Sequence, residues 1–409
     1  MKIAMMTNNY KPFIGGVPVS IERLSEGLRN LGHEVVVFAP SYKNQVYEED
    51  VIRYKTFLEG WAGGIAIPDC HDEKIQQIFE KEQFDIIHVH HPMLIGKRAV
   101  ALAKKYGIPL VFTYHTQYEQ YFCYYLKPIR ALKVGIPFYL RHFLKSCDHV
   151  FAPTKGMREE LTAGNLIRQE LVSVLPTGLL ENSYAVRDNK AKAIRERYVK
   201  EAEILFCSVS RLAKEKNISF LLKSISIYKK KTKQRFRLLL VGDGPYRKEY
   251  EKECVELEIE KEVIFIGKIP NEEMGNYYAA SDLFLFASKT ETQGIVLLEA
   301  MAAGLPVVAL EAAGVRDLVE NEKNGYLTAE KEETFANVLI NVTEDRGNYE
   351  RLSKEAVKTA EKYREEIIVK EALKQYENLI LQGHKKMYNT SDRTHAIIGA
   401  EENYGYMEA

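Results

Sequence analysis

The stretch Glu291-Thr-Gln-Gly-Ile-Val-Leu-Leu-Glu299-Ala-Met-Ala-Ala-Gly304-Leu-Pro306 decides the fold of the second half of this chain. An apolar run, Asp282-Leu-Phe-Leu-Phe-Ala287, precedes it, and its length and aromatic content are typical of a buried parallel strand. Gly304 and Pro306 stop a helix before a second apolar run, Val307-Val-Ala-Leu310. The pattern therefore predicts a strand, a short loop, a helix and a second strand.

The start of this helix predicts an anion site. The backbone N–H groups of Gly294, Ile295 and Val296 would point out of the carboxyl edge of the sheet, and a helix N-terminus carries unpaired donors and a partial positive charge. Glu291 lies just outside this end and Glu299 lies about a turn and a half further in, so they are roughly 8 Å or more apart. That gap is too wide for carboxylates that share a proton. It suits two groups that hold separate hydroxylated parts of one ligand around a central phosphate.

On most helices two glutamates at this spacing are surface charges. Glu299, however, falls inside the apolar run Ile-Val-Leu-Leu-Glu-Ala-Met-Ala, where an unpaired carboxylate is costly to bury. The stretch resembles the Glu-x7-Glu signature of family-4 retaining glycosyltransferases, which have the GT-B fold. This resemblance implies that Glu291 holds the donor sugar and that Glu299 holds the ribose of the nucleotide.

Length and composition set the protein class. The 409 residues suffice for two or three domains, and 46% hydrophobic with 28% charged residues is ordinary for a soluble globular protein. The 57 basic and 57 acidic residues balance, so a nucleic-acid partner is not indicated. The five scattered cysteines form neither a disulfide framework nor a metal knuckle. Met1 runs directly into a strand and no long apolar run follows, so we expect a cytoplasmic protein.

The first half opens with a β-α-β pattern. Lys2-Ile-Ala-Met-Met-Thr7 reads as a strand, a loop with Gly15 and Gly16 follows, and a helix near 20–31 precedes the strand Val35–Pro40. Such a loop admits phosphate-bearing ligands in doubly wound folds, although the dinucleotide fingerprint is missing and a tight turn alone would explain the glycines. The resemblance implies that the loop at Gly16 closes over the donor diphosphate.

Histidines follow two of the predicted strands. His88, His90 and His91 end one of them, where strand alternation places His88 and His90 on one face. Metal ligation lacks a nearby Cys, Asp or Glu cluster, so we interpret this end as a polar wall that opens on a cleft. His115 follows the strand 108–114, and His-Thr-Gln-Tyr-Glu resembles the family members that glycosylate diacylglycerol. There, the histidine lies beside the transferring sugar.

No acidic residue occurs between Gln120 and Cys147, where cations and aromatic residues alternate. This composition suits contact with an anionic membrane surface, and a core helix with a solvated basic face explains it nearly as well. Pro128 and Pro137 are expected to break the segment into short pieces. The residues assigned to the membrane or the acceptor are Tyr124, Tyr125, Lys127, Arg130 and Lys133. Cys123, which precedes Tyr124, departs from the diacylglycerol-specific pattern, where a histidine is often found.

Two cations follow a strand in the second half. The segment Ser210-Arg211-Leu-Ala-Lys-Glu-Lys216-Asn217 comes directly after the apolar run 204–209. Such residues are often merely solvated, but at the carboxyl end of a strand an arginine and a lysine suit a diphosphate. The segment resembles the family motif whose arginine and lysine bind the donor diphosphate. By the same resemblance, the backbone from Gly267 to Ile269 reads the nucleobase.

The β/α alternation in both halves, together with the resemblance over residues 1–382, predicts an α/β protein of the GT-B fold with two Rossmann-like doubly wound domains that face each other across a cleft. The expected boundaries are 1–182 for an acceptor-binding domain and 195–365 for a nucleotide-sugar domain. A last helix, about 366–382, would cross back to the first domain, and 383–409 would be a polar tail.

The resemblance implies a retaining hexosyltransferase that moves glucose from UDP-glucose, or a near relative, to a lipid such as 1,2-diacylglycerol. Catalytic roles fall to His115, Glu291, Arg211 and Lys216, without a cofactor and without a metal ion. The protein would touch an anionic membrane peripherally, on the inner face of the cell membrane. The alternatives are a small soluble alcohol or another lipid-linked acceptor, a sugar-nucleotide epimerase of the same fold, and a nucleotide-sugar-binding protein without activity.

Overall fold

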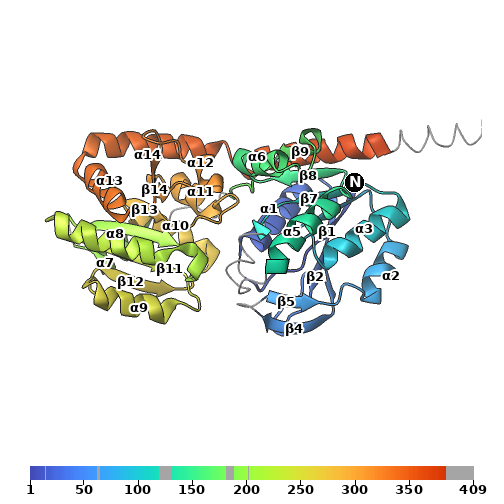
Figure 1. Cartoon of the computed structure of the whole chain (residues 1–409), viewed down its shortest axis with the longest axis horizontal. Helices are drawn as coiled ribbons and strands as arrows, with labels where there is room; N and C mark the ends of the chain where they lie inside the picture. The colour runs from blue at the N-terminus through green and yellow to red at the C-terminus, as the bar shows by residue number, and fades with distance from the viewer. Residues whose placement is uncertain (14, 62–64, 119–129, 181–187, 201, 384–409) are drawn as a thin grey trace, which may run out of the picture.

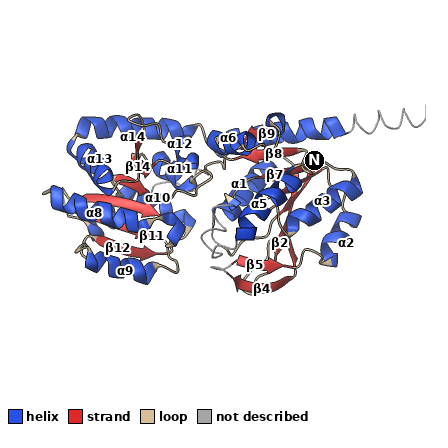
Figure 2. Cartoon of the chain, viewed as in Figure 1, coloured by secondary structure: helices blue, strands red, loops and turns tan. Residues whose placement is uncertain are grey.

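The computed structural model describes residues 1–13, 15–61, 65–118, 130–180, 188–200 and 202–383. It has two lobes, each built around its own sheet, and a helix near the C-terminus that reaches from the second lobe to the first (Figure 1). Helices and strands alternate along the chain in both lobes, as Figure 2 shows. The prediction of two Rossmann-like domains is therefore confirmed.

The first lobe contains a seven-stranded parallel sheet in the order β3-β2-β1-β6-β7-β8-β9. Its strands are β1 (Lys2–Met6), β2 (Glu34–Pro40), β3 (Val51–Tyr54), β6 (Ile86–Val89), β7 (Leu110–Thr113), β8 (His149–Ala152) and β9 (Val172–Val174). Its helices are α1 (Gly16–Asn30), α2 (Glu73–Lys81), α3 (Ile95–Tyr106), α5 (Arg130–Leu144) and α6 (Lys155–Ala163), and β4 (Thr56–Trp61) pairs with β5 (Ile65–Pro68) as a hairpin.

The second lobe contains a six-stranded parallel sheet in the order β12-β11-β10-β13-β14-β15. Its strands are β10 (Ile204–Val209), β11 (Phe236–Val241), β12 (Val263–Gly267), β13 (Leu283–Phe286), β14 (Val307–Leu310) and β15 (Gly325–Thr328). Its helices are α7 (Asp188–Tyr198), α8 (Ile218–Lys231), α9 (Arg247–Glu256), α10 (Asn271–Ala280), α11 (Ile295–Ala302), α12 (Ala313–Arg316), α13 (Glu332–Glu344) and α14 (Arg346–Glu361).

Alternate residues of each central strand enter different cores, which explains why the strands are apolar without interruption. In β1, Ile3 and Met5 belong to one hydrophobic cluster, whereas Ala4 and Met6 belong to another on the opposite face. Helices must therefore cover both faces of the sheet, as is usual for parallel sheets. This arrangement leaves the carboxyl ends of the strands as the place where a ligand can reach the sheet.

Residues 365–383 form the helix that returns to the first lobe. Val369, Ala372 and Tyr376 are buried in the same hydrophobic cluster as Ile3 and Met5 of β1. α7 packs on α10, so the chain from residue 188 lies with the second lobe, upstream of the boundary at 195 suggested by the sequence. Within the described ranges, no helix is both long and apolar enough to cross a bilayer.

One expectation about local structure is wrong. Pro137 does not end a helix, because α5 continues through it from Arg130 to Leu144. Ile136, Leu140 and Phe143 are buried on one side of this helix and pack into the core of the first lobe. Their packing outweighs the backbone hydrogen bond that the proline removes.

Candidate active site

Two loops of the second lobe meet because β10 and β13 are parallel neighbours. Lys216, in the 3-10 turn that follows β10, forms an ion pair with Glu291, in the loop that follows β13. Arg211 forms an ion pair with Glu215 at 2.6 Å, and the backbone carbonyl of Glu215 accepts from Ser288 at 3.5 Å. The predicted cations and the first predicted glutamate therefore lie at the same edge of the sheet.

The helix start that follows has the geometry expected for an anion site. Gly294 precedes α11 with φ 79°, in the left-handed region that glycine adopts without strain. α11 then opens with Ile295 and Val296, whose N–H groups belong to the unpaired first turn of the helix. A Cβ added to Gly16, at the first turn of α1, would come within 4.0 Å of Cδ1 of Ile295. The first turns of α1 and α11 thus face each other across the two lobes.

Glu299 is held from both lobes. Its Oε1 lies 2.6 Å from Nη2 of Arg23 in α1, and its Oε2 accepts from the hydroxyl of Tyr278 in α10 at 3.1 Å. The side chains of Arg23 and Glu299 are only 5% and 12% exposed. Arg23 also donates to the carbonyl of Gly178 at 2.9 Å, near the start of the connection between the lobes. Arg23 was not among the predicted site residues, although its place beside Ser20, Leu24 and Gly27 on the buried face of α1 was a signal.

His115 lies against the loop that carries Glu291. Its backbone carbonyl accepts from Oγ1 of Thr292 at 2.9 Å. Two residues further along, Nε2 of Gln117 approaches the carbonyl of Glu291 at 3.4 Å. Burial, and then the neighbouring histidines, keep the pKa of His115 well below the usual value, so the imidazole is neutral. Gln117, like Arg23, was not among the site residues predicted from the sequence.

Further contacts bind the same loop to the first lobe. The side-chain amide of Gln293 accepts from the N–H of Thr177 at 2.7 Å and donates to its carbonyl at 3.1 Å. The hydroxyl of Thr154 donates to the carbonyl of Thr292 at 2.9 Å. The described contacts therefore join the loop that follows β13 to the other lobe through residues 291–293.

The interpretation of the three-histidine strand end needs correction. His88 does not open on a cleft: it is fully buried, and its two ring nitrogens pair with the hydroxyls of Tyr376 and Thr113 at 2.6 and 2.7 Å. His91 accepts at Nδ1 from the backbone N–H of Asn8 at 3.1 Å. His90 pairs with His115 instead. No group of three potential metal-binding side chains occurs in the part of the chain that the structure describes.

Gly267 and Ile269 lie apart from this cluster, at the end of β12 on the edge of the second sheet. The carbonyl of Gly267 accepts from the N–H of Gly242 at 2.8 Å, so two glycine turns lie together at the carboxyl edge. Ile269 is partly buried against the hydrophobic core of this lobe. Their role toward the nucleobase stays a prediction.

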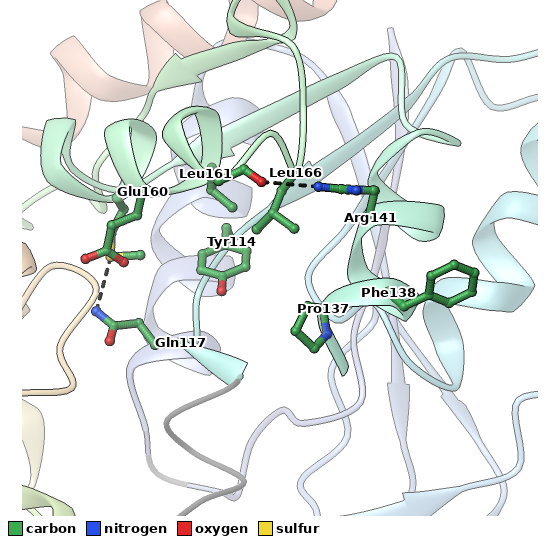
Figure 3. Close-up of a pocket in the computed structure, with 10 residues that line it drawn as sticks. Tyr114, Gln117, Pro137, Phe138, Arg141, Glu160, Leu161 and Leu166 are labelled. Atoms are coloured by element: carbon green, nitrogen blue, oxygen red, sulfur yellow. Dashed lines mark hydrogen bonds between the residues drawn. The ribbon is translucent and has the colours of Figure 1, made fainter. Parts of the chain in front are cut away.

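A cavity of about 450 Å³ lies in the first lobe between α5 and α6 (Figure 3). Gln117 and Phe138 stand on opposite sides of it in Figure 3, and Phe138 is 77% exposed. Because Gln117 also touches the carbonyl of Glu291, the cavity adjoins the loop described above. The lining residues are Tyr114, Gln117, Pro137, Phe138, Arg141, Met157, Glu160, Leu161, Gly164 and Leu166.

The residues assigned to membrane contact fall largely outside this description. Tyr124, Tyr125 and Lys127 lie outside the described residues. Arg130 and Lys133 belong to α5, but their side chains also fall outside what the structure describes. The rest of the helix has an outer face that consists of Phe138, Arg141 and His142, and Lys145 follows directly after the helix; all four are exposed.

Two protein-family models match this chain, and each match falls within one of the two lobes. Residues 14–179 match the family model Glycosyltransferase Family 4, and residues 189–359 match Glycosyl transferases group 1. An alpha-monoglucosyldiacylglycerol synthase of Acholeplasma laidlawii is 30% identical, over 95% of this chain and 99% of its own length. Its namesake from Streptococcus pneumoniae is 30% identical over 80% of this chain and 75% of its own.

A solved structure agrees with the fold. The Anabaena protein HepE in complex with UDP-glucose superposes with a TM-score of 0.73 at 21% identity, and the match covers 92% of this chain and all of that one. At this identity the likeness concerns the fold alone, two Rossmann-like lobes of the GT-B type. Together with the family matches, it means that this chain belongs to glycosyltransferase family 4 and is a GT-B hexosyltransferase.

Proposed function

We propose that the protein is a retaining glucosyltransferase that moves glucose from UDP-glucose to a lipid acceptor such as 1,2-diacylglycerol. The observation that carries this proposal is the loop 291–293, where Glu291 pairs with Lys216 on one side and meets Gln117 of the cavity wall on the other. The names of the two bacterial relatives support diacylglycerol as the acceptor. UDP-glucose, bound in the Anabaena structure, supports the donor.

The donor would span the edge of the second sheet. Arg211, Lys216 and the first N–H groups of α11 would face the diphosphate, because all three supply positive charge or hydrogen-bond donors at one edge. Glu291 would then bind sugar hydroxyls and Glu299 the ribose. Each carboxylate oxygen can accept a second hydrogen bond, so Glu299 can bind a ribose hydroxyl while Arg23 and Tyr278 keep it in place.

Transfer would proceed without a covalent enzyme intermediate. The bond between the anomeric carbon and the diphosphate oxygen breaks, and the acceptor oxygen forms a new bond to that carbon on the same face. The acceptor hydroxyl proton passes to the departing diphosphate, whose growing charge Arg211 and Lys216 would stabilise. Groups placed in advance toward such charge commonly supply the largest catalytic contribution, and one donor is worth about 3 kcal/mol.

The lipid would approach from the first lobe. The cavity beside Gln117 is lined largely by apolar side chains, and its volume lies in the range of ligand pockets. Phe138 and Arg141 on the outer face of α5, with Lys145 just after its end, combine an aromatic ring with cations, a composition suited to an anionic bilayer surface. We therefore infer peripheral membrane contact along α5.

A labelling experiment tests donor, acceptor and stereochemistry together. The full-length protein is incubated with radiolabelled UDP-glucose, UDP-galactose or GDP-mannose and with phosphatidylglycerol vesicles that contain or lack diacylglycerol. We expect label in the organic phase only with UDP-glucose and diacylglycerol, and an α-anomeric proton in the product NMR spectrum. Label on glycerol or another soluble alcohol would reject the lipid acceptor, and a β-anomer would reject retention.

Vesicle sedimentation tests the membrane contact separately. The triple variant Lys127→Glu, Arg130→Glu, Lys133→Glu should lose binding to anionic vesicles, because each cation near such a surface contributes about 1 kcal/mol. Hydrolysis of the donor in the absence of vesicles should be unchanged. The matched control is Lys229→Glu, Lys230→Glu, Lys231→Glu, which reverses three lysines at the end of α8 in the other lobe. If the wild-type protein does not bind anionic vesicles at low salt, the proposal of membrane contact is wrong.

A further inference from the structure

Two histidines meet at the carboxyl ends of neighbouring strands in the first lobe. His90 follows β6 and His115 follows β7, and these strands are parallel neighbours. Nδ1 of His90 lies 2.9 Å from Nε2 of His115, with the ring centroids 5.1 Å apart and the ring planes 24° apart. This geometry is a hydrogen bond between two rings whose planes are nearly parallel.

Both rings are neutral. His90 is 1% exposed and His115 is half-buried. Burial is the main cause that lowers the pKa of each ring well below its usual value, and repulsion from neighbouring histidines adds to it. A neutral imidazole has one N–H donor and one acceptor nitrogen, so the bond between the two rings allows only two arrangements of protons. Either His90 donates from Nδ1, or His115 donates from Nε2.

The remaining nitrogen of His90 decides between these arrangements. Nε2 of His90 is buried and has no hydrogen-bond partner among the described residues. If it carried the proton, a buried N–H would lack an acceptor, which folded proteins avoid more strictly than an unpaired acceptor atom. His88 offers no acceptor nearby, because both of its nitrogens are already paired. The proton of His90 therefore lies on Nδ1 and points at His115.

His115 must then carry its own proton on Nδ1. In the described part of the chain, its only side-chain hydrogen bond is the one from His90. Its backbone touches Thr292, and Gln117 reaches the carbonyl of Glu291, so residue 115 stands next to the loop assigned to the donor sugar. An N–H donor is thus available beside that loop.

We propose that His90 is a positioning residue, which holds His115 in the tautomer that presents an Nδ1–H donor to a hydroxyl of the transferring sugar. The contact with the sugar rests on the proposed function, whereas the tautomer does not. His90 itself would touch no substrate. It would act by preventing the His115 ring from turning or from moving its proton to Nε2.

Nitrogen NMR on the full-length protein labelled with ¹⁵N-histidine tests the tautomer directly. Two-bond proton–nitrogen correlations distinguish Nδ1–H from Nε2–H, and the signals of His115 are assigned by their loss in His115→Gln. We expect Nδ1–H in wild type and a mixture of both tautomers in His90→Leu. His90→Asn, whose amide N–H can replace Nδ1–H, should restore the wild-type signal. His91→Asn, a change at a neighbouring buried histidine, should leave the signal unchanged.

Kinetics test the positioning role on the same variants. For His90→Leu we expect kcat to fall about tenfold while the affinity for UDP stays the same, and His90→Asn should recover most of kcat. An Nε2–H tautomer of His115 in wild type would overturn the proposal without any variant. A shifted tautomer with unchanged kcat would overturn the positioning role alone. If wild type transferred no sugar, the proposed function would fall, and the tautomer result would remain readable.

Discussion

Both lobes carry site groups on loops that follow adjacent strands, but these groups are charged in the second lobe and neutral histidines in the first. Lys216 and Glu291 pair at the ends of β10 and β13, and both are charged. The first lobe supplies neutral histidines from two strands and Arg23 from α1. None of the ten histidines lies between residues 150 and 383.

This difference follows from what each lobe would bind. A diphosphate carries charge, and charges at the carboxyl edge of a sheet can bind it without deep burial. A sugar or lipid hydroxyl needs oriented neutral donors and acceptors, and buried groups keep their orientation because their neighbours fill the space around them. The charged groups at the sheet edge can therefore be placed from strand order, whereas the burial that orients the neutral groups depends on tertiary contacts, such as that of Tyr376 with His88.

Removing a cation from the second lobe should have the largest effect. We expect Lys216→Ala to lower turnover by about 10² to 10³, the usual cost of losing one group that stabilises developing charge. Lys214→Ala is the matched control, because Lys214 lies in the same 3-10 turn with its side chain exposed. Initial rates with saturating donor measure both. Equal losses in the two variants would mean that the loop, and not the charge of Lys216, matters.

Mildly acidic pH should lower the stability of the first lobe more than that of the second. Burial lowers the pKa of His88 to about 3 and those of His91 and His149 to about 4, below the value of about 6.5 in the unfolded chain. These folded-state values are depressed, so their stabilising effect is complete above pH 6.5 and is lost as the pH falls toward 4. From pH 7 to 6, each histidine should cost roughly 0.7 kcal/mol, or about 2 kcal/mol for the three.

Amide hydrogen exchange at the two pH values, corrected for intrinsic rates, measures this loss strand by strand. Between pH 7 and pH 6, the free energy of opening should decrease for β6 to β8. For β10 and β13, in the lobe without histidines, it should stay the same. An equal fall in both lobes would show that buried histidines do not set the acid sensitivity.

Arg23 is an exception to this division between the lobes, because it is a charged residue of the first lobe that binds Glu299 of the second. Arg23→Met should weaken UDP binding about tenfold, or roughly 1.4 kcal/mol, since Glu299 loses the partner that orients it. Arg29→Met is the control on the same helix, where the arginine pairs at the surface with Asp50. Calorimetry with UDP measures both. Tighter UDP binding in Arg23→Met would instead mean that Arg23 competes with the ribose.

The structural features that the sequence predicted correctly depend either on one short stretch of sequence or on the order of the strands in the sheet. Gly294 and the helix after it follow from a single stretch, and the Lys216–Glu291 pair follows once β10 and β13 are neighbours. Arg23 and Glu299 are 276 residues apart, and only the docking of the lobes joins them. The interpretation of His88 was wrong because Tyr376, from the helix that crosses back, covers it. No local pattern contains that information.

Removal of divalent metal ions by a chelator should leave the rate of glucose transfer unchanged. Arg211, Lys216 and the first turn of α11 would meet the charge of the diphosphate, so the second lobe would need no added divalent ion. Protein that has been dialysed against EDTA and checked for metal content should transfer glucose at the rate of untreated protein. Lys216→Ala sharpens this test, because Mg²⁺ or Mn²⁺ should raise the activity of that variant more than the activity of wild type. If wild type instead lost turnover in EDTA and regained it with either ion, Arg211 and Lys216 would not suffice to neutralise the diphosphate. The proposal that the second lobe supplies all the charge needed at the site would then be wrong.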